Sequence, residues 1–199
     1  MTGAAARATT IAWAVVPPRG LWPAATVLGG SALIALAAQL AIPLPFTPVP
    51  VTGQTFAVLL VGAALGARAG TLAVVAYLVE GLLGAPVFAG GRSAWSASAV
   101  PGVPVILGPS AGYLGGFVAA AALVGWLAER GHDRRFRTAA VAMACGTLAI
   151  YLFGAGWLAR SIGLESAIRL GVLPFLAADL FKVLLAAAAL PAAWRLVRR

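Results

Sequence analysis

Six long apolar runs constrain the fold of this chain more than any other feature of its sequence. They cover roughly residues 21–42, 54–67, 69–88, 110–128, 138–158 and 172–194. About 20 consecutive apolar residues in a helix cross the hydrocarbon core of a bilayer, which is about 30 Å thick. Only 10% of the residues are charged, which is low for a water-soluble domain. The sequence therefore predicts an all-α integral membrane protein with six transmembrane helices.

The second run, residues 54–67, is short for a complete crossing. Gly62, Gly66 and Gly70 lie in it or just after it. Because small residues let helices approach closely in lipid, we expect either close packing here or a tight turn at residues 67–70 into the third helix.

The basic residues are divided unevenly between the two sides of the predicted bundle. Short cytoplasmic loops of membrane proteins are enriched in Lys and Arg. With the N-terminus inside, this pattern predicts a multi-pass protein of the plasma membrane with both termini in the cytoplasm. It also explains the net charge of +9 without nucleic-acid binding. The inner arginines are Arg7, Arg19, Arg68, Arg130, Arg134, Arg135, Arg137, Arg195, Arg198 and Arg199, and the outer ones are Arg92, Arg160 and Arg169.

The first 20 residues contain only a short apolar segment, which Pro17 and Pro18 interrupt. A secretory signal needs a longer apolar centre. We expect residues 1–20 to form a loosely ordered cytoplasmic tail and residues 21–199 to form one six-helix transmembrane domain.

The segment IPLPFTPVPVTGQTF, residues 42–56, carries four prolines and no charge. Proline removes a backbone donor and fixes φ, so a helix cannot pass through it. It lies on the same predicted side as the loop of residues 84–110, which is rich in Gly, Pro and Ser. Irregular backbone at membrane depth is tolerated only where protein buries it or it lines a cavity. We expect both loops to fold back as a cap over the outer mouth of the bundle, with flexible surface linkers as the alternative.

Asp179 and Lys182 lie in the sixth run, three residues apart, so one helical face carries both. Ionised groups in a membrane are costly and are expected to face the bundle interior. The pair is predicted to bind a polar ligand; mutual neutralisation within the helix is the alternative.

Glu80 follows Tyr77 by three residues in the third run, so both can line one cavity wall. Glu80 is also close enough to the outer loop to reach water instead. Gln54 begins the second helix beside Thr52 and Thr55, where it can contact a ligand or cap the helix.

Catalytic and metal chemistry have little support. The chain has one cysteine, Cys145, and one histidine, His132. It lacks the H-E-x-x-H and G-x-S-x-G motifs and has a single embedded aspartate, so an intramembrane enzyme is not expected. It also lacks a phosphate-binding loop, so the chain itself cannot use ATP.

Four motifs stand out in chain order: IPLPFTPVPVTGQTFAVLLVGAALG from residue 42, YLVEGLLGAPVFAGG from residue 77, GPSAGYLGGF from residue 108 and DLFK from residue 179. Together they resemble the BioY family of biotin-binding substrate subunits (S components) of energy-coupling-factor (ECF) transporters. The resemblance covers about residues 35–185. It implies a six-helix fold that captures biotin in an outward-opening pocket, without a cofactor.

The resemblance also implies partners, namely a transmembrane coupling subunit and two ABC-type ATPases. Pairs of small residues on the first helix, Ser31/Ala35 and Ala37/Ala41, would then dock the coupling subunit. Packing within the chain's own bundle explains these pairs equally well.

Biotin chemistry suits the candidate residues. An ionised Asp179 can accept from a ureido N–H, and Lys182 can donate to the ureido carbonyl or to the carboxylate. Arg92 on the outer cap can hold the carboxylate at the mouth. The expected apolar walls are Tyr77, Phe88 and Tyr113.

Three other functions remain open. A proton-coupled secondary transporter could use Glu80, Asp179 and Lys182 as a relay. A substrate subunit for another small vitamin would share the same fold. A purely structural membrane subunit would bind no ligand.

Overall fold

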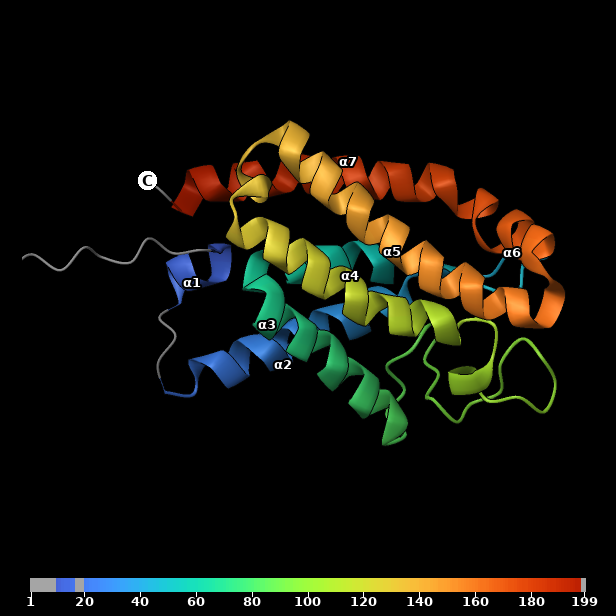
Figure 1. Cartoon of the computed structure of the whole chain (residues 1–199). Helices are drawn as coiled ribbons and strands as arrows, with labels where there is room; N and C mark the ends of the chain where they lie inside the picture. Colours follow the sequence, from blue (N-terminus) through green and yellow to red (C-terminus); the bar gives the residue numbers. More distant parts are fainter. Residues whose placement is uncertain (1–9, 17–19, 198–199) are drawn as a thin grey trace, which may run out of the picture.

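The computed structural model describes residues 10–16 and 20–197 as one helical bundle (Figure 1). Its long helices are α2 (Trp22–Gln39), α3 (Gln54–Leu82), α4 (Ala111–Glu129), α5 (Phe136–Ile162) and α7 (Leu176–Val197). Two helices are short, α1 (Ile11–Val15) and α6 (Leu164–Gly171). Five helical stretches of the described chain are long and apolar enough to cross a membrane. The predicted class, an all-α multi-pass membrane protein, is confirmed.

The second and third predicted helices both lie inside α3, which is broken at Gly66. That residue has φ 87° and ψ 176°, a conformation essentially limited to glycine, so residues 54–65 and 67–82 form two arms (Figure 1). The turn was predicted at residues 67–70 and lies slightly earlier. The first arm has 12 residues, about 18 Å of helix, which is shorter than the hydrocarbon core.

Side chains from two other helices satisfy the backbone groups exposed by this break. The indole N–H of Trp13 in α1 donates to the carbonyl of Leu65 over 3.1 Å. The amide of Ala67 donates to Oε1 of Glu129, at the end of α4, over 2.8 Å. In lipid an unpaired backbone group costs several kcal/mol, so these two bonds let the chain reverse direction inside the bundle.

Helices α3 and α4 pack closely because glycines, which have no side chain, lie at two of their contact points. A Cβ atom on Gly125 would overlap the amide nitrogen of Ala67, and one on Gly62 would lie 2.9 Å from the carbonyl oxygen of Ala121. Small residues at such positions let helix backbones pack directly, which is how helices associate where lipid weakens the hydrophobic effect.

Several predicted boundaries are corrected. The third helix ends at Leu82 rather than residue 88, because the backbone turns at Gly84 with φ 96°, so Phe88 lies in a loop. Residues 11–15 of the expected loose tail form helix α1, held by the bond from Trp13 to Leu65; residues 1–9 and 17–19 lie outside the described chain. Residues 164–171, between the fifth and sixth predicted helices, form the short helix α6.

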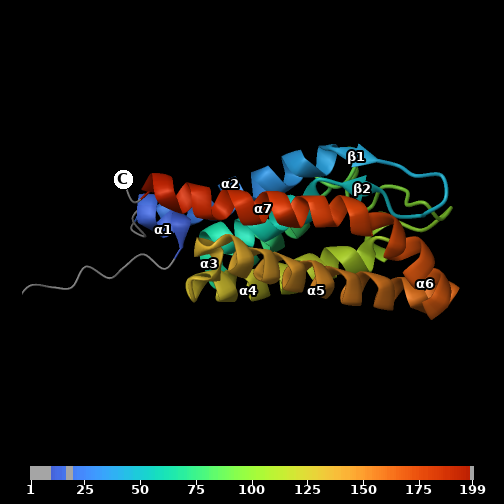
Figure 2. The same ribbon diagram turned by 90° about the horizontal axis from the view of Figure 1, so that it is seen from above.

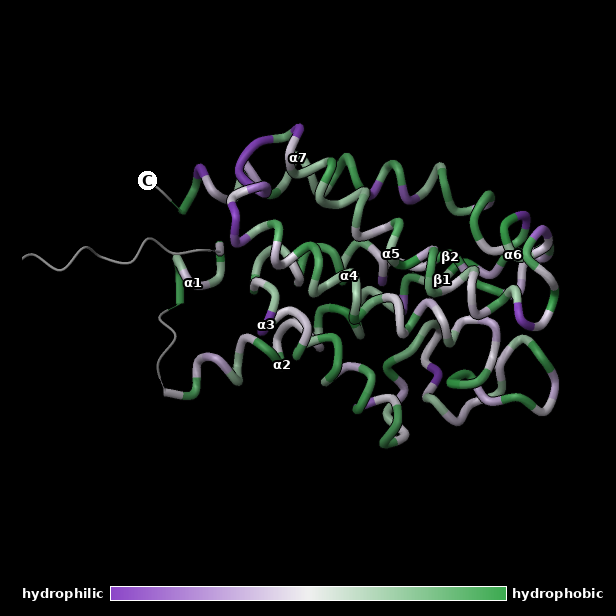
Figure 3. The backbone as a smooth tube through the Cα atoms, viewed as in Figure 1, coloured by the Kyte–Doolittle hydropathy of each residue, from purple (hydrophilic) through white to green (hydrophobic). Residues whose placement is uncertain are grey.

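The loops between α2 and α3 and between α3 and α4, and the segment between α5 and α7, lie at the end of the bundle away from Val197, the last residue of α7 (Figure 2). We call this end, formed by residues 40–53, 83–110 and 163–175, the chamber end. Residues 40–53 there form a hairpin whose short strands β1 (Ala41–Ile42) and β2 (Val51–Thr52) pair antiparallel. The other end carries the polar turn at residues 130–135 between α4 and α5 (Figure 3). We call it the arginine end.

Candidate ligand-binding chamber

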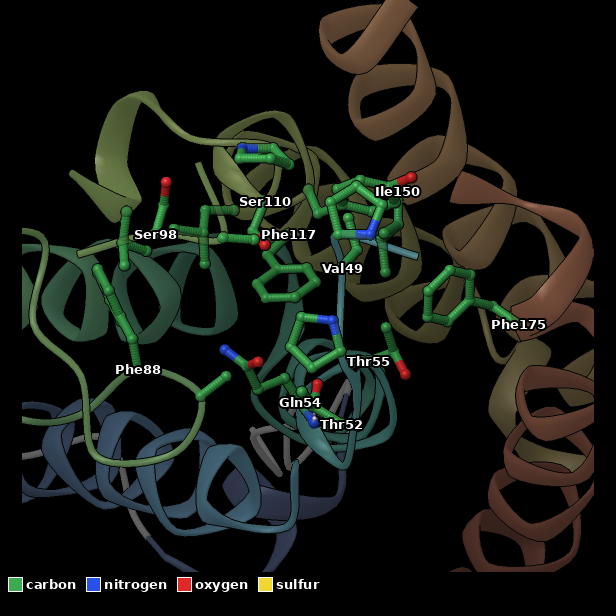
Figure 4. A pocket seen from close by; sticks show the side chains of 18 of the residues that line it. Val49, Thr52, Gln54, Thr55, Phe88, Ser98, Ser110, Phe117, Ile150 and Phe175 are labelled. Atoms are coloured by element: carbon green, nitrogen blue, oxygen red, sulfur yellow. Dashed lines mark hydrogen bonds between the residues drawn. The ribbon is translucent and has the colours of Figure 1, made fainter. Parts of the chain in front are cut away.

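A chamber of about 820 Å³, part of it open to solvent, lies between the helices at the chamber end. Its wall is mostly apolar, with a few polar groups. Figure 4 shows Phe88 and Phe175 on opposite sides and Thr52, Gln54 and Thr55 between them. The lining residues come from both long loops, α3, α4, α5, the turn before α7, and α7: Pro48, Val49, Pro50, Thr52, Gln54, Thr55, Phe88, Ala89, Arg92, Ser98, Ala99, Val105, Pro109, Ser110, Tyr113, Leu114, Phe117, Ile150, Tyr151, Phe175, Asp179 and Lys182.

The two loops predicted to form a cap do fold back onto the bundle. Val49 in the proline segment is only 7% exposed, and Phe88 in the second loop is 2% exposed. The second loop is held by a bond from the amide of Ala94 to the carbonyl of Gly81 at 3.0 Å. The cap is confirmed, and the alternative of flexible surface linkers is wrong.

Asp179 and Lys182 lie in the first two turns of α7 and face this chamber. Nζ of Lys182 is 2.7 Å from Oδ1 of Asp179. The same ammonium donates to the carbonyl of Thr52 at 2.8 Å and to the hydroxyl of Thr55 at 2.9 Å. The three N–H donors of Lys182 are therefore all used, and they join α7 to the start of α3.

The carboxylate of Asp179 is held from three elements. Its Oδ1 accepts from Lys182 and from the hydroxyl of Thr55. Its Oδ2 accepts from the phenol of Tyr151 in α5 at 2.5 Å. A carboxylate has about four lone-pair positions, so Oδ2 can accept one more bond from a ligand in the chamber.

Gln54 lines the chamber, whereas Tyr77 lies behind Gln54 and does not line it. Nε2 of Gln54 donates to the hydroxyl of Tyr77 at 2.5 Å, and Tyr77 is fully buried. The rings of Tyr77 and Phe88 lie 5.2 Å apart at a tilted angle. Tyr77 was predicted as part of the chamber wall; it instead supports two residues that are.

Arg92 and Tyr113 both line the chamber, as predicted. Nε of Arg92 donates to the carbonyl of Ala89 at 2.9 Å, and its terminal nitrogens have no partner among the described residues. The hydroxyl of Tyr113 donates to the carbonyl of Gly171 at 2.7 Å, so its ring forms the wall while its polar end is bonded elsewhere.

Glu80 does not line the chamber, and the wall it was predicted to share with Tyr77 is not formed. Its carboxylate accepts from the hydroxyl of Ser31 in α2, with 2.7 Å to each oxygen. This bond turns Ser31 inward, and Ser31 is fully buried. The pair Ser31/Ala35 therefore faces the chain's own bundle rather than a partner.

Sequence reasoning missed several residues of the chamber. Tyr151, which holds Asp179, and the apolar residues Phe117, Ile150 and Phe175 were not predicted. Thr55 was named beside Gln54, but its bond to Asp179 was not predicted. A phenol in the middle of the fifth apolar run was the one available signal, because a buried tyrosine hydroxyl needs a partner. Within the described residues, no group of three or more His, Cys, Asp or Glu side chains could hold a metal ion.

Mostly apolar pockets with a few directed polar groups are the usual binding sites for small organic molecules. Fold and chamber together define the class: a multi-pass membrane protein with a binding chamber for a small solute. The chain belongs to the BioY family, whose sequence model matches residues 10–199.

Relatives and a solved structure agree with this assignment. A probable biotin transporter BioY of Pyrococcus horikoshii is 39% identical over 151 residues, which cover 76% of this chain and 83% of that protein. A biotin transporter BioY of Rhizobium etli is 34% identical over 170 residues, covering 81% and 87%. The crystal structure of the S component for biotin from an ECF-type ABC transporter superposes with a TM-score of 0.77 at 25% identity, over 93% of this chain and 95% of that one. Family proteins of this kind are transport subunits rather than enzymes, as the sequence predicted.

Proposed function

We propose that this chain binds biotin in the chamber and acts as the substrate-capture subunit of an ECF-type ABC transporter. One observation carries the proposal: the ion pair of Asp179 and Lys182 faces a largely apolar chamber instead of lipid. The names of its relatives and of the superposed S component support biotin as the solute.

The ureido ring of biotin is proposed to lie against α7. It offers two N–H donors and one carbonyl acceptor, and Oδ2 of Asp179 has room for one of those N–H groups. Lys182 has no free donor in this structure, so a ureido carbonyl reaches it only by replacing the carbonyl of Thr52 or the hydroxyl of Thr55. We therefore assign the first polar contact to Asp179, with Lys182 holding that carboxylate in place.

The other end of the ligand is proposed to meet Arg92. The bond from its Nε to Ala89 fixes the side chain, and the terminal guanidinium nitrogens are left for the valerate carboxylate. The thioether ring and the valerate chain then lie between apolar walls that include Phe88, Tyr113 and Phe117. Gln54 adds an amide oxygen, because its Nε2 is bonded to Tyr77.

Transport requires a source of energy outside this chain, and we propose the coupling subunit and two ATPases of an ECF module. The outer face of α2 suits contact with a membrane partner, because Leu28 and Leu36 are 59% and 69% exposed. Gly29 lies in open space, since a Cβ atom added to it would have no other atom within 4 Å, and a small residue there lets a partner helix approach closely. We further propose that both termini are cytoplasmic and that the chamber opens outward, because the arginines cluster at the opposite end.

Equilibrium titration of the detergent-purified protein with biotin and desthiobiotin tests the proposal. We expect saturable biotin binding, weaker binding of desthiobiotin, and loss of binding in Asp179→Asn. Glu165→Gln, a charge removal outside the chamber, is the matched control and should bind as the wild type does. Absence of saturable biotin binding by the folded wild type would reject biotin as the solute.

A further inference from the structure

A second hollow lies on the outside of the chamber end, between the first cap loop and α6. Phe46, Ser166, Arg169, Leu170 and Pro174 line it, and it holds about 790 Å³, part of it open solvent. None of these five residues lines the chamber. Neither the proposed biotin site nor the fold itself accounts for it.

Helix α6 is amphipathic on its exposed side. Ala167 and Gly171 are buried against the bundle. Leu164 and Ile168, four residues apart and therefore neighbours on the helix surface, are 64% and 43% exposed. Glu165, one residue after Leu164, and Arg169, one after Ile168, form a charged strip beside that apolar strip.

An exposed helix divided in this way is typical of a segment that lies at a membrane–water boundary. The position of α6 agrees, because it joins the end of α5 to the start of α7 at the end of the bundle (Figure 1). Figure 3 shows hydrophilic and hydrophobic residues alternating over it. A phospholipid at such a boundary would present its head group and the first part of its acyl chains to the hollow beside α6.

The three arginines of the chamber end differ in what they contact. Arg92 is bonded to Ala89 and lines the chamber. The guanidinium of Arg160 lies 5.3 Å from the centre of the Trp157 ring, within cation–π range. Arg169 has no hydrogen bond, ion pair or ring contact among the described residues. No acidic side chain is among the residues that line the hollow around this cation.

The rest of the hollow indicates which anion would fit. Ser166 and Arg169 are three residues apart on α6, so the hydroxyl and the guanidinium face the same space. Both are donors to phosphate oxygens, and arginine binds phosphate with two parallel N–H bonds. The other three lining residues, Phe46, Leu170 and Pro174, are apolar. A cation beside an apolar wall suits a ligand that has both an anionic group and an apolar part better than it suits a free ion.

We propose that this hollow binds one membrane phospholipid, with its phosphate on Arg169 and Ser166 and its glycerol and upper acyl chain along Phe46, Leu170 and Pro174. Because Phe46 belongs to the first cap loop and the others to α6 and the turn after it, the bound lipid holds the cap loop beside α6. The proposal does not depend on which solute the chamber binds.

Native mass spectrometry of the full chain, delipidated in detergent and titrated with phosphatidylglycerol, tests the proposal. We expect one lipid to bind first and well apart from the rest. Arg169→Gln should weaken that first binding about tenfold or more, and Ser166→Ala a few-fold, as expected for charge-assisted and neutral bonds to phosphate. Arg160→Gln removes the same charge from the same end and should leave it unchanged.

Three results would overturn the proposal. The first is an unchanged first lipid affinity in Arg169→Gln, and the second is an equal loss in Arg160→Gln, which would indicate general attraction to positive charge. The third is binding of diacylglycerol with the same chains, or of inorganic phosphate alone, as tight as that of phosphatidylglycerol. Tight diacylglycerol binding would show that the phosphate is not needed, and tight phosphate binding would show that the acyl chain is not needed. A biotin titration of Arg169→Gln that matches the wild type shows that the variant is folded. If biotin is not the solute, an unfolding temperature equal to that of the wild type gives the same control.

Discussion

The phenol of Tyr151 donates a hydrogen bond of 2.5 Å to Oδ2 of Asp179, and so joins the middle of α5 to the start of α7 across the chamber wall. Thr55 at the start of α3 bonds the other carboxylate oxygen. Three helices thus meet at one side chain. The geometry of Asp179 is set by this junction as much as by its neighbour Lys182.

Removal of the phenol hydroxyl should therefore weaken ligand binding without removing a charge. We expect Tyr151→Phe to bind biotin about tenfold more weakly, because Asp179 loses a charge-assisted bond that fixes its direction. The check is equilibrium titration beside Thr138→Ala, which removes a hydroxyl at the arginine end, where Thr138 donates to the carbonyl of Arg135. Equal affinity of Tyr151→Phe and the wild type would show that Tyr151 does not position the carboxylate.

Tyr77 is expected to act on the ligand only through Gln54. Tyr77→Phe removes the acceptor of Nε2 and should weaken biotin binding about fivefold, the usual effect of one neutral hydrogen bond. In a Gln54→Leu background the same change should have no further effect on affinity. A double-mutant cycle measures this coupling, and additive losses would contradict the positioning role.

Gly66 should resist substitution by alanine, in contrast to Gly29 in α2. At φ 87° an alanine is strained, and its Cβ would lie 2.6 Å from Oε1 of Glu129, the oxygen that accepts from Ala67. We expect Gly66→Ala to lower the free energy of unfolding by about 1–3 kcal/mol. Gly29→Ala in α2, where the added methyl meets nothing within 4 Å, should be neutral or slightly stabilising. Thermal unfolding in detergent compares the two, and equal midpoints would be inconsistent with a glycine-specific break.

Asp133, in the turn between α4 and α5 outside the membrane spans, predicts a pH effect on stability. Burial raises the pKa of this carboxyl above its ordinary value of 3.8, although the bond from the indole of Trp194 acts in the opposite direction. The folded state then binds the proton more tightly than the unfolded chain does. The contribution of Asp133 is largest below its ordinary pKa and is lost as the pH rises through the raised, folded-state value.

Asp133→Asn keeps an acceptor for Trp194 and does not titrate. Thermal unfolding of both proteins from about pH 4 to pH 8 should show the wild type losing stability relative to the variant as the pH rises. A difference that is constant across this range would mean that Asp133 does not titrate differently on folding.

Membrane insertion, the six apolar segments, the cap and the family were all predictable from the sequence. These features depend on local properties: the length of an apolar run, prolines that exclude helix, motifs of adjacent residues, and the spacing of Asp179 and Lys182 along one helix. Such properties depend on residues that are close together in the sequence and not on how the helices are arranged. Even the break in α3 was visible, as a short run followed by glycines.

Only the tertiary structure decided which polar groups meet. Thr55 and Asp179 are 124 residues apart in the chain, and their contact depends on the rotation of two helices about their own axes. The same rotations place Tyr77 behind Gln54 and turn Glu80 toward Ser31, although their spacing in the sequence favours both for the chamber wall. A helix that is apolar on every side carries no sequence signal for the direction it faces, so side-chain packing between helices sets that direction.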